Sequence, residues 1–262
     1  MTYAALQVAR TGLDAQNARM RVIANNLANV NTTGFKRDRA EFETLAYQQM
    51  TAPGAVSSGD ARYAIGLNLG SGVEIKGTAR VNTQGSLETT DNPFDVAIEG
   101  DGFFQVARPD GTTGYTRAGN FHLSAEGALV TSEGYAIQPA IQIPDGASTV
   151  TIGADGTVSA VQPGSSEATE IGKIEIARFA NPAGMQALGG NLYAETSASG
   201  SAQTGAAGID GRGTIRQGML ESSNVNIVQE LVDMIETQRA YEVNSKMISS
   251  TDEMLRNANQ QL

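Results

Sequence analysis

Apolar residues near the C-terminal end of the chain recur at spacings of three, four and seven, which is the pattern of one face of an α-helix. Residues 222–262 contain no Gly or Pro that would break such a helix. A row that keeps a seven-residue period predicts a left-handed supercoil against a second helix. Ser222, Ser223 and Asn224 are residue types that cap helix N-termini, so we predict that the helix begins there. The positions that we expect in the helix–helix seam are Ile227, Leu231, Met234, Ile235, Tyr241, Ile248, Leu255 and Leu262.

Residues 2–31 carry the same pattern and predict a second long helix. Its seam positions are Leu6, Leu13, Met20, Ile23, Leu27 and Val30. Residues 1–40 hold six Lys or Arg against two Asp, whereas residues 222–262 hold six acids against three bases, so charge favours contact between the two helices. We predict that the two ends of the chain pair. The alternative is that two amphipathic helices pack separately on the middle of the chain.

The end of the first helix is marked by poor helix formers at residues 29–33 and by Gly34, which can take the left-handed conformation that terminates helices. Amides are dense before it, at Asn17, Asn25, Asn26, Asn29 and Asn31. An amide buried in a helical seam fixes the register, because a slip leaves it unpaired. Amides that face water would only weaken the helix. Apolar residues beyond Gly34 then predict a short second helix over residues 37–50.

The middle of the chain differs from its ends in residue composition and in the pattern of apolar residues. Residues 51–72 are rich in Gly, Pro and Ser and predict a long loop or irregular extended structure. From residue 73 to about 194, short alternating apolar runs are separated by turns in which an acid precedes Gly, such as Asp101-Gly102 and Asp155-Gly156. This pattern predicts an antiparallel β-sandwich or partly open barrel. Residues 197–213 are small and polar and predict a second flexible connection.

These elements predict an α+β protein in which N- and C-terminal helices pair as a coiled coil around an inserted, mainly antiparallel β domain. The expected domains are a terminal helical domain of residues 1–35 and 222–262, a connecting region of residues 36–90 and 197–221 with a long extended loop, and an outer β domain of residues 91–196.

The amino-acid composition argues against several classes of function. A chain of 262 residues can bury a substantial core. Its net charge of −10 argues against binding nucleic acid or an anionic membrane, and the absence of Cys removes disulfides and thiolate metal sites. No apolar run approaches the roughly 20 residues of a membrane-spanning helix. No cleaved signal peptide is expected, which fits either the cytoplasm or an export route that removes no signal.

A search for catalytic chemistry finds no strong candidate. His122 is the single histidine and is expected to be structural, since one His without Cys cannot build a transition-metal site alone. Glu99 and Asp101 flank a hairpin Gly, and paired acids such as Asp91 and Asp95 lack the repeated loop of a calcium site. We therefore expect no catalytic, metal or cofactor site and no small-molecule substrate.

Three separated motifs identify the chain as a member of the bacterial flagellar axial proteins, the family of rod, hook and hook-junction subunits. Residues 24–36 (ANNLANVNTTGFK) closely resemble the N-terminal motif of that family, and its most telling positions are Asn26, Leu27, Ala28, Asn29, Thr33, Gly34 and Phe35. Residues 224–226 (NVN), 230–235 (ELVDMI) and 238–242 (QRAYE) resemble its C-terminal motif. Residues 85–104 (GSLETTDNPFDVAIEGDGFF) and 115–121 (YTRAGNF) match between them, so the resemblance covers nearly the whole chain.

The resemblance implies a structural subunit of the distal part of the flagellar rod, which polymerises into a helical tube that crosses the periplasm and transmits torque to the hook. It implies that the terminal helices line the core of the tube and that the β domain faces outward. The implied partners are further copies of the chain, proximal rod subunits, the hook protein, the basal-body ring proteins and the flagellar export apparatus, which would export the chain without cleavage.

Alternatives to the distal rod remain open at this point. The chain could be another axial subunit of the proximal rod or hook, a soluble coiled-coil protein that presents a β-domain binding module as adhesins do, or a hydrolase using acids of the β domain. Independently of these, the irregular segment after the first helix is expected to become ordered in the polymer and to stiffen it. The residues assigned to this stiffening segment are Ala46, Pro53, Gly54, Ser57, Gly59 and Arg62.

Overall fold

The structure is a computed structural model that describes residues 2–53, 56–58, 61–62, 64–144, 146–147, 149–162 and 167–260. The chain divides into two compact units. The first, the arm unit, contains residues 1–27, 38–79 and 226–262, and the second, the body unit, contains residues 28–37 and 80–225. The predicted α+β class is confirmed: the N- and C-terminal helices contact each other, and the chain between them is antiparallel β structure.

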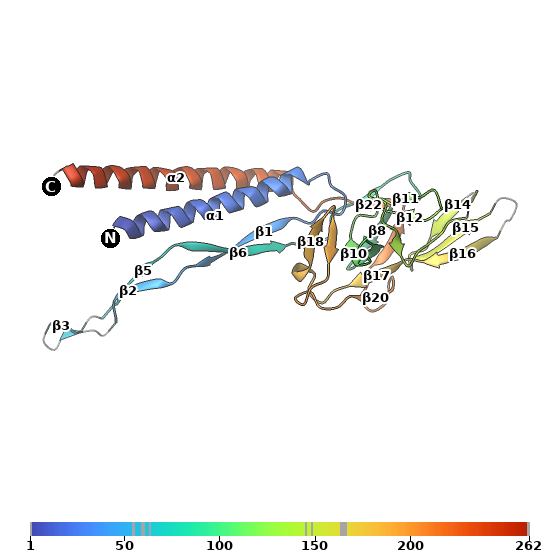
Figure 1. The fold of residues 1–262 in the computed structure, drawn as a ribbon, viewed down its shortest axis with the longest axis horizontal. Helices are drawn as coiled ribbons and strands as arrows, with labels where there is room; N and C mark the ends of the chain where they lie inside the picture. Colours follow the sequence, from blue (N-terminus) through green and yellow to red (C-terminus); the bar gives the residue numbers. More distant parts are fainter. Residues whose placement is uncertain are drawn as a thin grey trace. The chain divides into compact units, whose positions relative to one another are not determined.

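The arm unit contains the two long helices and the first six strands (Figure 1). Over the described residues, neither helix is long and apolar enough to span a membrane. The elements are α1 (Thr2–Ala28), β1 (Asp38–Thr44), β2 (Tyr47–Thr51), β3 (Val56–Ser58), β4 (Ala61–Arg62), β5 (Leu67–Gly70), β6 (Val73–Arg80) and α2 (Ile227–Gln260).

The body unit contains the remaining strands and one short 3₁₀ helix. They are β7 (Leu87–Thr89), β8 (Val96–Glu99), β9 (Phe103–Ala107), β10 (Thr113–Thr116), β11 (His122–Leu123), β12 (Leu129–Val130), β13 (Ile137–Gln138), β14 (Thr149–Ile152), β15 (Thr157–Val161), β16 (Ala168–Lys173), β17 (Glu175–Arg178), η1 (Pro182–Gly184), β18 (Gln186–Gly189), β19 (Leu192–Ala194), β20 (Gln203–Ala206), β21 (Thr214–Gln217) and β22 (Met219–Glu221).

Helix α1 ends at Ala28, three residues before the predicted end, and a tight turn follows. In this turn the Thr32 amide donates to the Asn29 carbonyl over 3.2 Å, and the Phe35 amide donates to the Thr32 carbonyl over 3.2 Å. Gly34 has a φ of +68°, so its predicted left-handed conformation is confirmed.

Helix α2 begins later than the sequence suggested. Its cap is Asn226, whose Oδ1 accepts hydrogen bonds from the amides of Val228 at 3.0 Å and Gln229 at 3.2 Å. The expected start at residues 222–224 is wrong because Asn224 is engaged elsewhere: its Nδ2 donates to the Val81 carbonyl at 2.8 Å, and its Oδ1 accepts from the Arg37 amide at 2.8 Å. Propensity alone cannot tell which of several adjacent Asn and Ser residues caps a helix.

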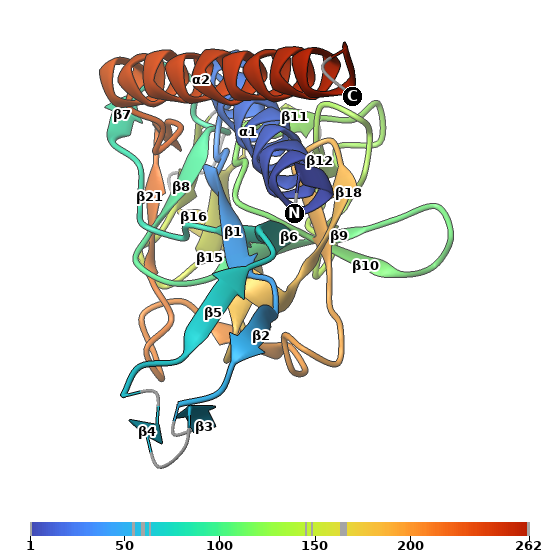
Figure 2. The same cartoon turned by 90° about the vertical axis from the view of Figure 1, so that its left-hand side faces the viewer.

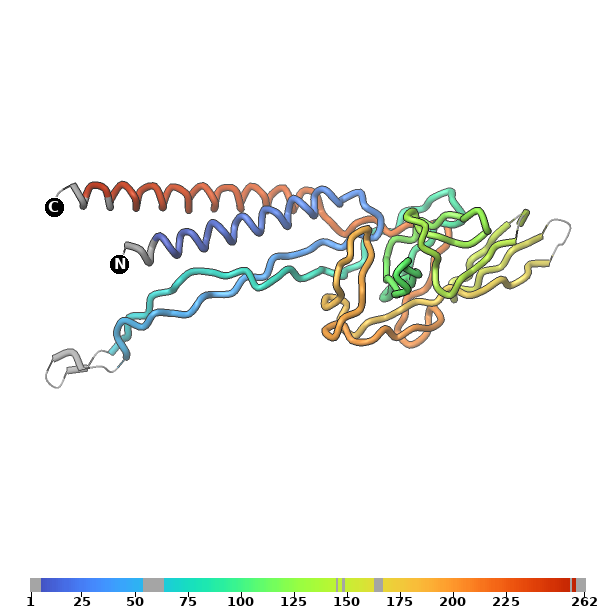
Figure 3. The backbone as a smooth tube through the Cα atoms, viewed as in Figure 1, coloured from blue at the N-terminus to red at the C-terminus, as the bar shows by residue number. Residues whose placement is uncertain are grey.

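The predicted short helix over residues 37–50 is also wrong. The segment instead forms β1 and β2, which pair with β6 and β5 on the returning strand, while β3 pairs with β4 farther along. The β1–β6 and β2–β5 ladders make one long antiparallel hairpin (Figure 3). In the segment where a loop or irregular extended structure was expected, residues 67–70 form strand β5, and residues 54–55, 59–60 and 63 lie outside the described residues. Helical spacing of three apolar residues is weak evidence, and pairing with a strand about thirty residues away overrides it.

The body unit is built on a seven-stranded antiparallel sheet with the order β18-β19-β10-β9-β17-β20, in which β13 also pairs with β9. A three-stranded sheet of β14, β15 and β16 and smaller ladders complete the unit. Strand β20 lies within residues 197–213 and pairs with β17 along its full length, so the flexible connection expected there is wrong in part. The ladders β21–β8 and β22–β7 bring the chain back before α2 begins.

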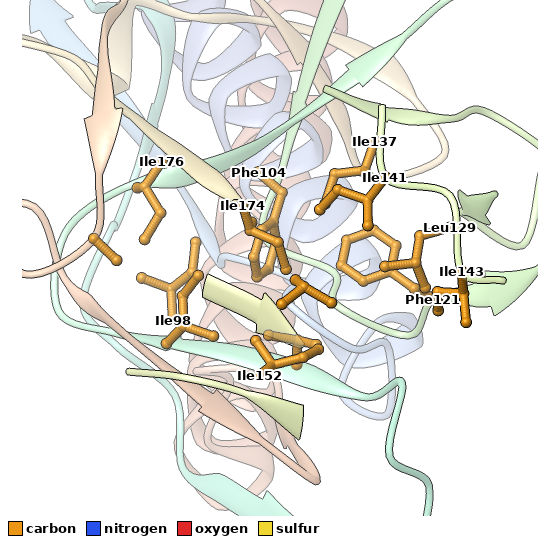
Figure 4. Packing of buried hydrophobic residues seen from close by; sticks show 14 residues of the cluster. Ile98, Phe104, Phe121, Leu129, Ile137, Ile141, Ile143, Ile152, Ile174 and Ile176 are labelled. Carbon is orange, nitrogen blue, oxygen red and sulfur yellow. The ribbon is translucent and has the colours of Figure 1, made fainter. Parts of the chain in front are cut away.

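The core of the body unit lies on both sides of strand β9. Phe104 packs edge-on against Phe121 with ring centroids 5.2 Å apart, inside a large aliphatic cluster (Figure 4). The neighbouring Phe103 points to the opposite face and packs against Phe179 and Tyr193 at centroid distances of 5.9 and 6.0 Å. This alternation follows from the two-residue period of a strand. Both faces of the central strand are therefore buried.

Candidate assembly surfaces and the motif junction

The two helices of the arm unit run antiparallel, with the chain ends at the same side (Figures 1 and 2). Polar groups take part in the contact between them. Arg19 Nη2 lies 3.4 Å from Asp233 Oδ1, and a side chain added at Gly12 would meet the Asn244 amide at 3.1 Å. Between these points Thr237 is fully buried. The face of α2 that meets α1 thus contains polar residues at seven-residue spacing, which the apolar pattern did not reveal.

Asn26 lies at the point where three elements of the arm unit meet. Its Nδ2 donates to Glu230 Oε2 on α2 at 3.2 Å and to the Asp38 carbonyl of β1 at 2.9 Å, while its Oδ1 accepts from the Asp38 amide at 2.9 Å. Asn26 and Glu230 are each 2% exposed. This is the geometry expected of an amide that fixes register, because a shift of either helix would leave Asn26 or Glu230 unpaired in a buried site.

The predicted seam residues differ in burial in the single chain. Ile23 is buried; Leu6, Leu13, Met20, Leu27, Val30, Met234 and Ile248 are half-buried; Ile227, Leu231, Ile235 and Tyr241 are exposed. Only the backbone of Leu255 is described, and Leu262 lies outside the described residues. The other four amides are outside the buried site, with Asn17, Asn25 and Asn31 exposed and Asn29 in the turn after α1.

The side of α2 remote from α1 exposes apolar residues in the single chain, together with charged residues such as Glu236, Arg239 and Lys246. Val228 is 71%, Leu231 43% and Ile235 51% exposed. At 100° per residue, Val228 and Ile235 lie close to half a turn around the helix from buried Glu230 and Thr237, and Leu231 lies about a third of a turn away. We call this surface the outer face of α2; its residues are Val228, Leu231, Val232, Ile235, Val243, Met247 and Met254.

The hairpin also exposes apolar side chains. Tyr47, Met50, Ile65 and Leu67 are all more than half exposed. Isolated exposed apolar residues are ordinary, but groups of them on the same unit make candidate contact surfaces.

The residues assigned to the stiffening segment lie in and around the hairpin strands. Ala46 follows β1, Pro53 follows β2, Ser57 is in β3 and Arg62 is in β4; Gly54 and Gly59 lie outside the described residues.

A buried ion cluster in the body unit joins the family motifs. Glu221, which is fully buried, accepts a short charge-assisted hydrogen bond from Lys36 and lies 3.0 Å from Arg117 Nε. The Gly85 amide donates to Glu221 Oε1 at 2.9 Å. Arg117 also donates from Nη1 to the carbonyl of Gly102 at 2.7 Å. The sequence analysis missed Glu221, a lone acid that ends an apolar strand.

Gly34 in the N-terminal motif is required by close packing as well as by its φ. A Cβ at this position would lie 2.7 Å from the backbone of Arg117 and Ala118, and the Gly34 amide donates to the Glu221 carbonyl at 2.7 Å. The Thr33 carbonyl accepts from Asn191 Nδ2 at 2.9 Å. Any larger residue at 34 would separate the turn after α1 from the Arg117 strand end.

Burial lowers the pKa of Lys36 below its ordinary value, and the nearby Arg117 adds to this effect. The hydrogen bond and charge of Glu221 oppose it. Lys36 is therefore held in a site where its charge depends on Glu221.

Comparisons with known proteins agree with the positions of the motifs. The family described as "Flagella basal body rod protein" matches residues 6–36, "Flagellar hook protein FlgE/F/G D1 domain" matches residues 97–160, and "Flagellar basal body rod FlgEFG protein C-terminal" matches residues 216–261. The flagellar basal-body rod protein FlgG of Buchnera aphidicola subsp. Acyrthosiphon pisum is 49% identical over 97% of this chain and 98% of its own length. The chain belongs to the flagellar basal-body rod protein family.

Within this rod family the chain is more similar to FlgG than to FlgF. In Caulobacter vibrioides, FlgG is 44% identical over 98% of both chains, whereas FlgF is 35% identical over 92% of this chain and 90% of its own length. As a rod-family member of the FlgG type, the chain is a structural subunit of the flagellar distal rod.

Proposed function

We propose that this rod subunit polymerises into a helical tube in which neighbouring copies cover the outer face of α2 and the exposed apolar residues of the hairpin. The observation that carries the proposal is the exposure of Val228, Leu231 and Ile235 in the single chain. Burying apolar area of this kind stabilises an assembly by about 25 cal/mol per Å². The predicted seam residues that are half-buried in the single chain would complete their burial in the same contacts.

The outer face of α2 and the hairpin are different surfaces of the arm unit. A contact between unlike surfaces of identical chains is heterologous, and when its rotation does not close it generates a helical polymer. The body unit has its own two-sided core and needs no neighbour for its stability. We therefore propose that the arm unit polymerises and that the body unit projects from the polymer, as the expected domain division suggested.

The wider role follows from membership of the rod family. The proposed partners are other rod subunits and the hook protein at the ends of the tube, the ring proteins around it, and the flagellar export apparatus that delivers the chain without cleaving a signal. The proposed location is the part of the basal body that spans the periplasm, where the tube transmits torque. The proposed role is mechanical, with no catalysis and no cofactor.

Hydrogen exchange tests this proposal directly. We expect amides of residues 228–235 to exchange at least about 100-fold more slowly in the polymer than in the monomer, because α2 in the single chain has one covered side and local opening is easy. Amides of the buried strand β17 (Glu175–Arg178) are the internal control and should be protected equally in both states. Equal protection of residues 228–235 in monomer and polymer would contradict the proposed contact.

The hairpin is proposed to stiffen the tube by filling space between neighbouring copies. The Leu45 amide donates to the Gly72 carbonyl at 3.0 Å, so the two strands are already in register at that point. Residues 46–71 can therefore be replaced by Asn-Gly, which closes two-residue hairpins. We expect this variant to keep the melting temperature of the body unit and to assemble into rods that bend more, measured as persistence length in electron micrographs.

A second variant distinguishes the effect of strand pairing in residues 46–71 from the effect of the length of this segment. Replacing residues 46–71 with a Gly/Ser segment of equal length keeps the chain connected but removes strand pairing and apolar contacts. It should give rods as flexible as the Asn-Gly variant. If both variants formed rods as straight as the parent, the stiffening role would be excluded.

A further inference from the structure

A small pocket in the body unit lies beside the buried ion cluster, and neither the rod role nor the family accounts for it. Its volume is about 150 Å³. Part of its wall is apolar, formed by Phe103, Phe179, Ala180 and Pro182, and its polar wall is formed by Lys36, Asn82, Asp101, Gly102, Arg117 and Arg178. The volume suits a group the size of a carboxylate or phosphate, not a nucleotide or sugar chain.

The charge of this pocket is opposite to that of the protein. Three cations line it against one acid, Asp101, while the whole chain has a net charge of −10. Glu221 lies behind the wall and neutralises one of the cations, which leaves one positive charge in excess. Lys36 is 2% and Arg117 5% exposed, so water screens this excess poorly.

Lys36 and Arg178 can donate more hydrogen bonds than they make in the structure. Lys36 Nζ carries three N–H groups and donates to Glu221 Oε1 and to the Thr83 carbonyl. Arg178 Nη1 makes a long contact of 3.4 Å to the Asp210 carbonyl. Arg117 directs its Nη1 and Nη2 to the Gly100 carbonyl, each at 2.9 Å. Donors from Lys36 and Arg178 can therefore serve a further acceptor.

We propose that this pocket is an oxyanion site, in which a carboxylate or phosphate group accepts hydrogen bonds from Lys36 and Arg178 and neutralises the excess charge. Burial lowers the pKa of Lys36, and Arg117 lowers it further, whereas the pair with Glu221 raises it, so the direction agrees with a cation in a poorly solvated site. Asp101 opposes binding, but its side chain is exposed and water screens it. The pocket is complete in the single chain, since every lining residue belongs to the body unit.

The first test uses thermal unfolding of the full monomeric chain in phosphate or acetate against chloride at equal ionic strength. We expect a rise in melting temperature of about 2 °C or more with phosphate, beyond its general stabilising effect. Arg178→Gln should lose this rise, and Arg108→Gln, which removes a cation of the same unit outside the pocket, should keep it. An equal phosphate response in the parent and Arg178→Gln would overturn the proposal.

A tethered anion gives a second test that needs no added ligand. Ala180 is exposed and lines the pocket, so Ala180→Glu can place a carboxylate beside the cations, and Ala180→Gln is its neutral match. Ala180→Glu should melt higher than Ala180→Gln and should no longer respond to phosphate. The difference between the two should vanish when Arg178→Gln is added, as a double-mutant cycle would report. Equal melting of the two Ala180 variants would contradict the site.

The bound oxyanion can be a free ion or an acidic side chain of a neighbouring copy. If it is a free ion, phosphate should stabilise the body unit in the polymer as it does in the monomer. If a neighbour supplies the group, the polymer should show no phosphate response, and Arg178→Gln should raise the protein concentration needed for assembly while Arg108→Gln does not.

Discussion

Replacing Leu231 and Ile235 with Asp should abolish assembly. Both side chains are exposed in the single chain and lie on the outer face of α2, where the proposed contact with a neighbour would bury them. A carboxylate buried without a partner costs several kcal/mol, and two such sites weaken one contact by a factor on the order of 10⁴ or more. Sedimentation of the assembled fraction and electron microscopy would measure the loss.

The monomer supplies the control for this result. Since Leu231 and Ile235 are already exposed there, the Asp variant should keep the melting temperature of the body unit. The conservative double variant, Leu231→Met with Ile235→Leu, keeps the surface apolar at similar volume and should still assemble. Normal rods from the Asp variant would exclude the outer face of α2 as a polymer contact.

Glu221→Gln should produce the largest loss of stability in the body unit. The substitution preserves shape but leaves Lys36 and Arg117 buried beside a neutral amide. Removing one partner of a buried ion pair costs about 3–5 kcal/mol. Because about 1 kcal/mol corresponds to 2–4 °C for domains of 150–250 residues, the melting temperature should fall by about 10 °C.

An exposed ion pair of the same unit is the matched control. Glu99 Oε2 lies 2.7 Å from Arg216 Nε, and both side chains are about half exposed, at 48% and 53%. Glu99→Gln should therefore change the unfolding free energy by less than about 1 kcal/mol. Similar melting shifts for the Glu221 and Glu99 variants would show that the ion cluster does not stabilise the unit as described.

The residues that carry the family resemblance have structural reasons in this chain. Gly34 meets the backbone of Arg117 too closely for any side chain, and Lys36 and Arg117 share the carboxylate of Glu221. Asn26 joins α1, β1 and α2. The motif at residues 24–36 thus makes contacts inside each unit: Asn26 within the arm unit, and Gly34 and Lys36 within the body unit.

The hairpin shows why part of the fold was not predictable. Residues 37–50 have apolar residues at helical spacing and residues 51–72 have the composition of a loop, yet strands β1, β2 and β5 of these segments pair in antiparallel ladders. Strand pairing depends on a partner far away in the sequence, so local pattern cannot establish it. The same reason explains β20, which a small polar composition concealed and pairing with β17 revealed.

Local sequence patterns were enough to predict the features that arise from local chemistry. These are two long helices from their apolar period, the left-handed Gly34, the tight turns in which Gly102, Gly111 and Gly156 have positive φ, and the family from its motifs. Such features depend on the conformational preferences of single residues and short repeats, and these preferences are the same wherever the segment lies in the fold.

Which polar groups share a site could be established from the folded structure alone. The apolar rows predicted that the helices pair, but polar positions of α2 also take part in the contact, and Glu230 and Thr237 are buried while Leu231 and Ile235 stay exposed. A buried polar residue is favourable only with its partner in place, and the partner of Glu221 lies 185 residues away at Lys36. Such pairings exist only once the chain has folded, because burial in the folded state both selects the partner and gives the contact its strength.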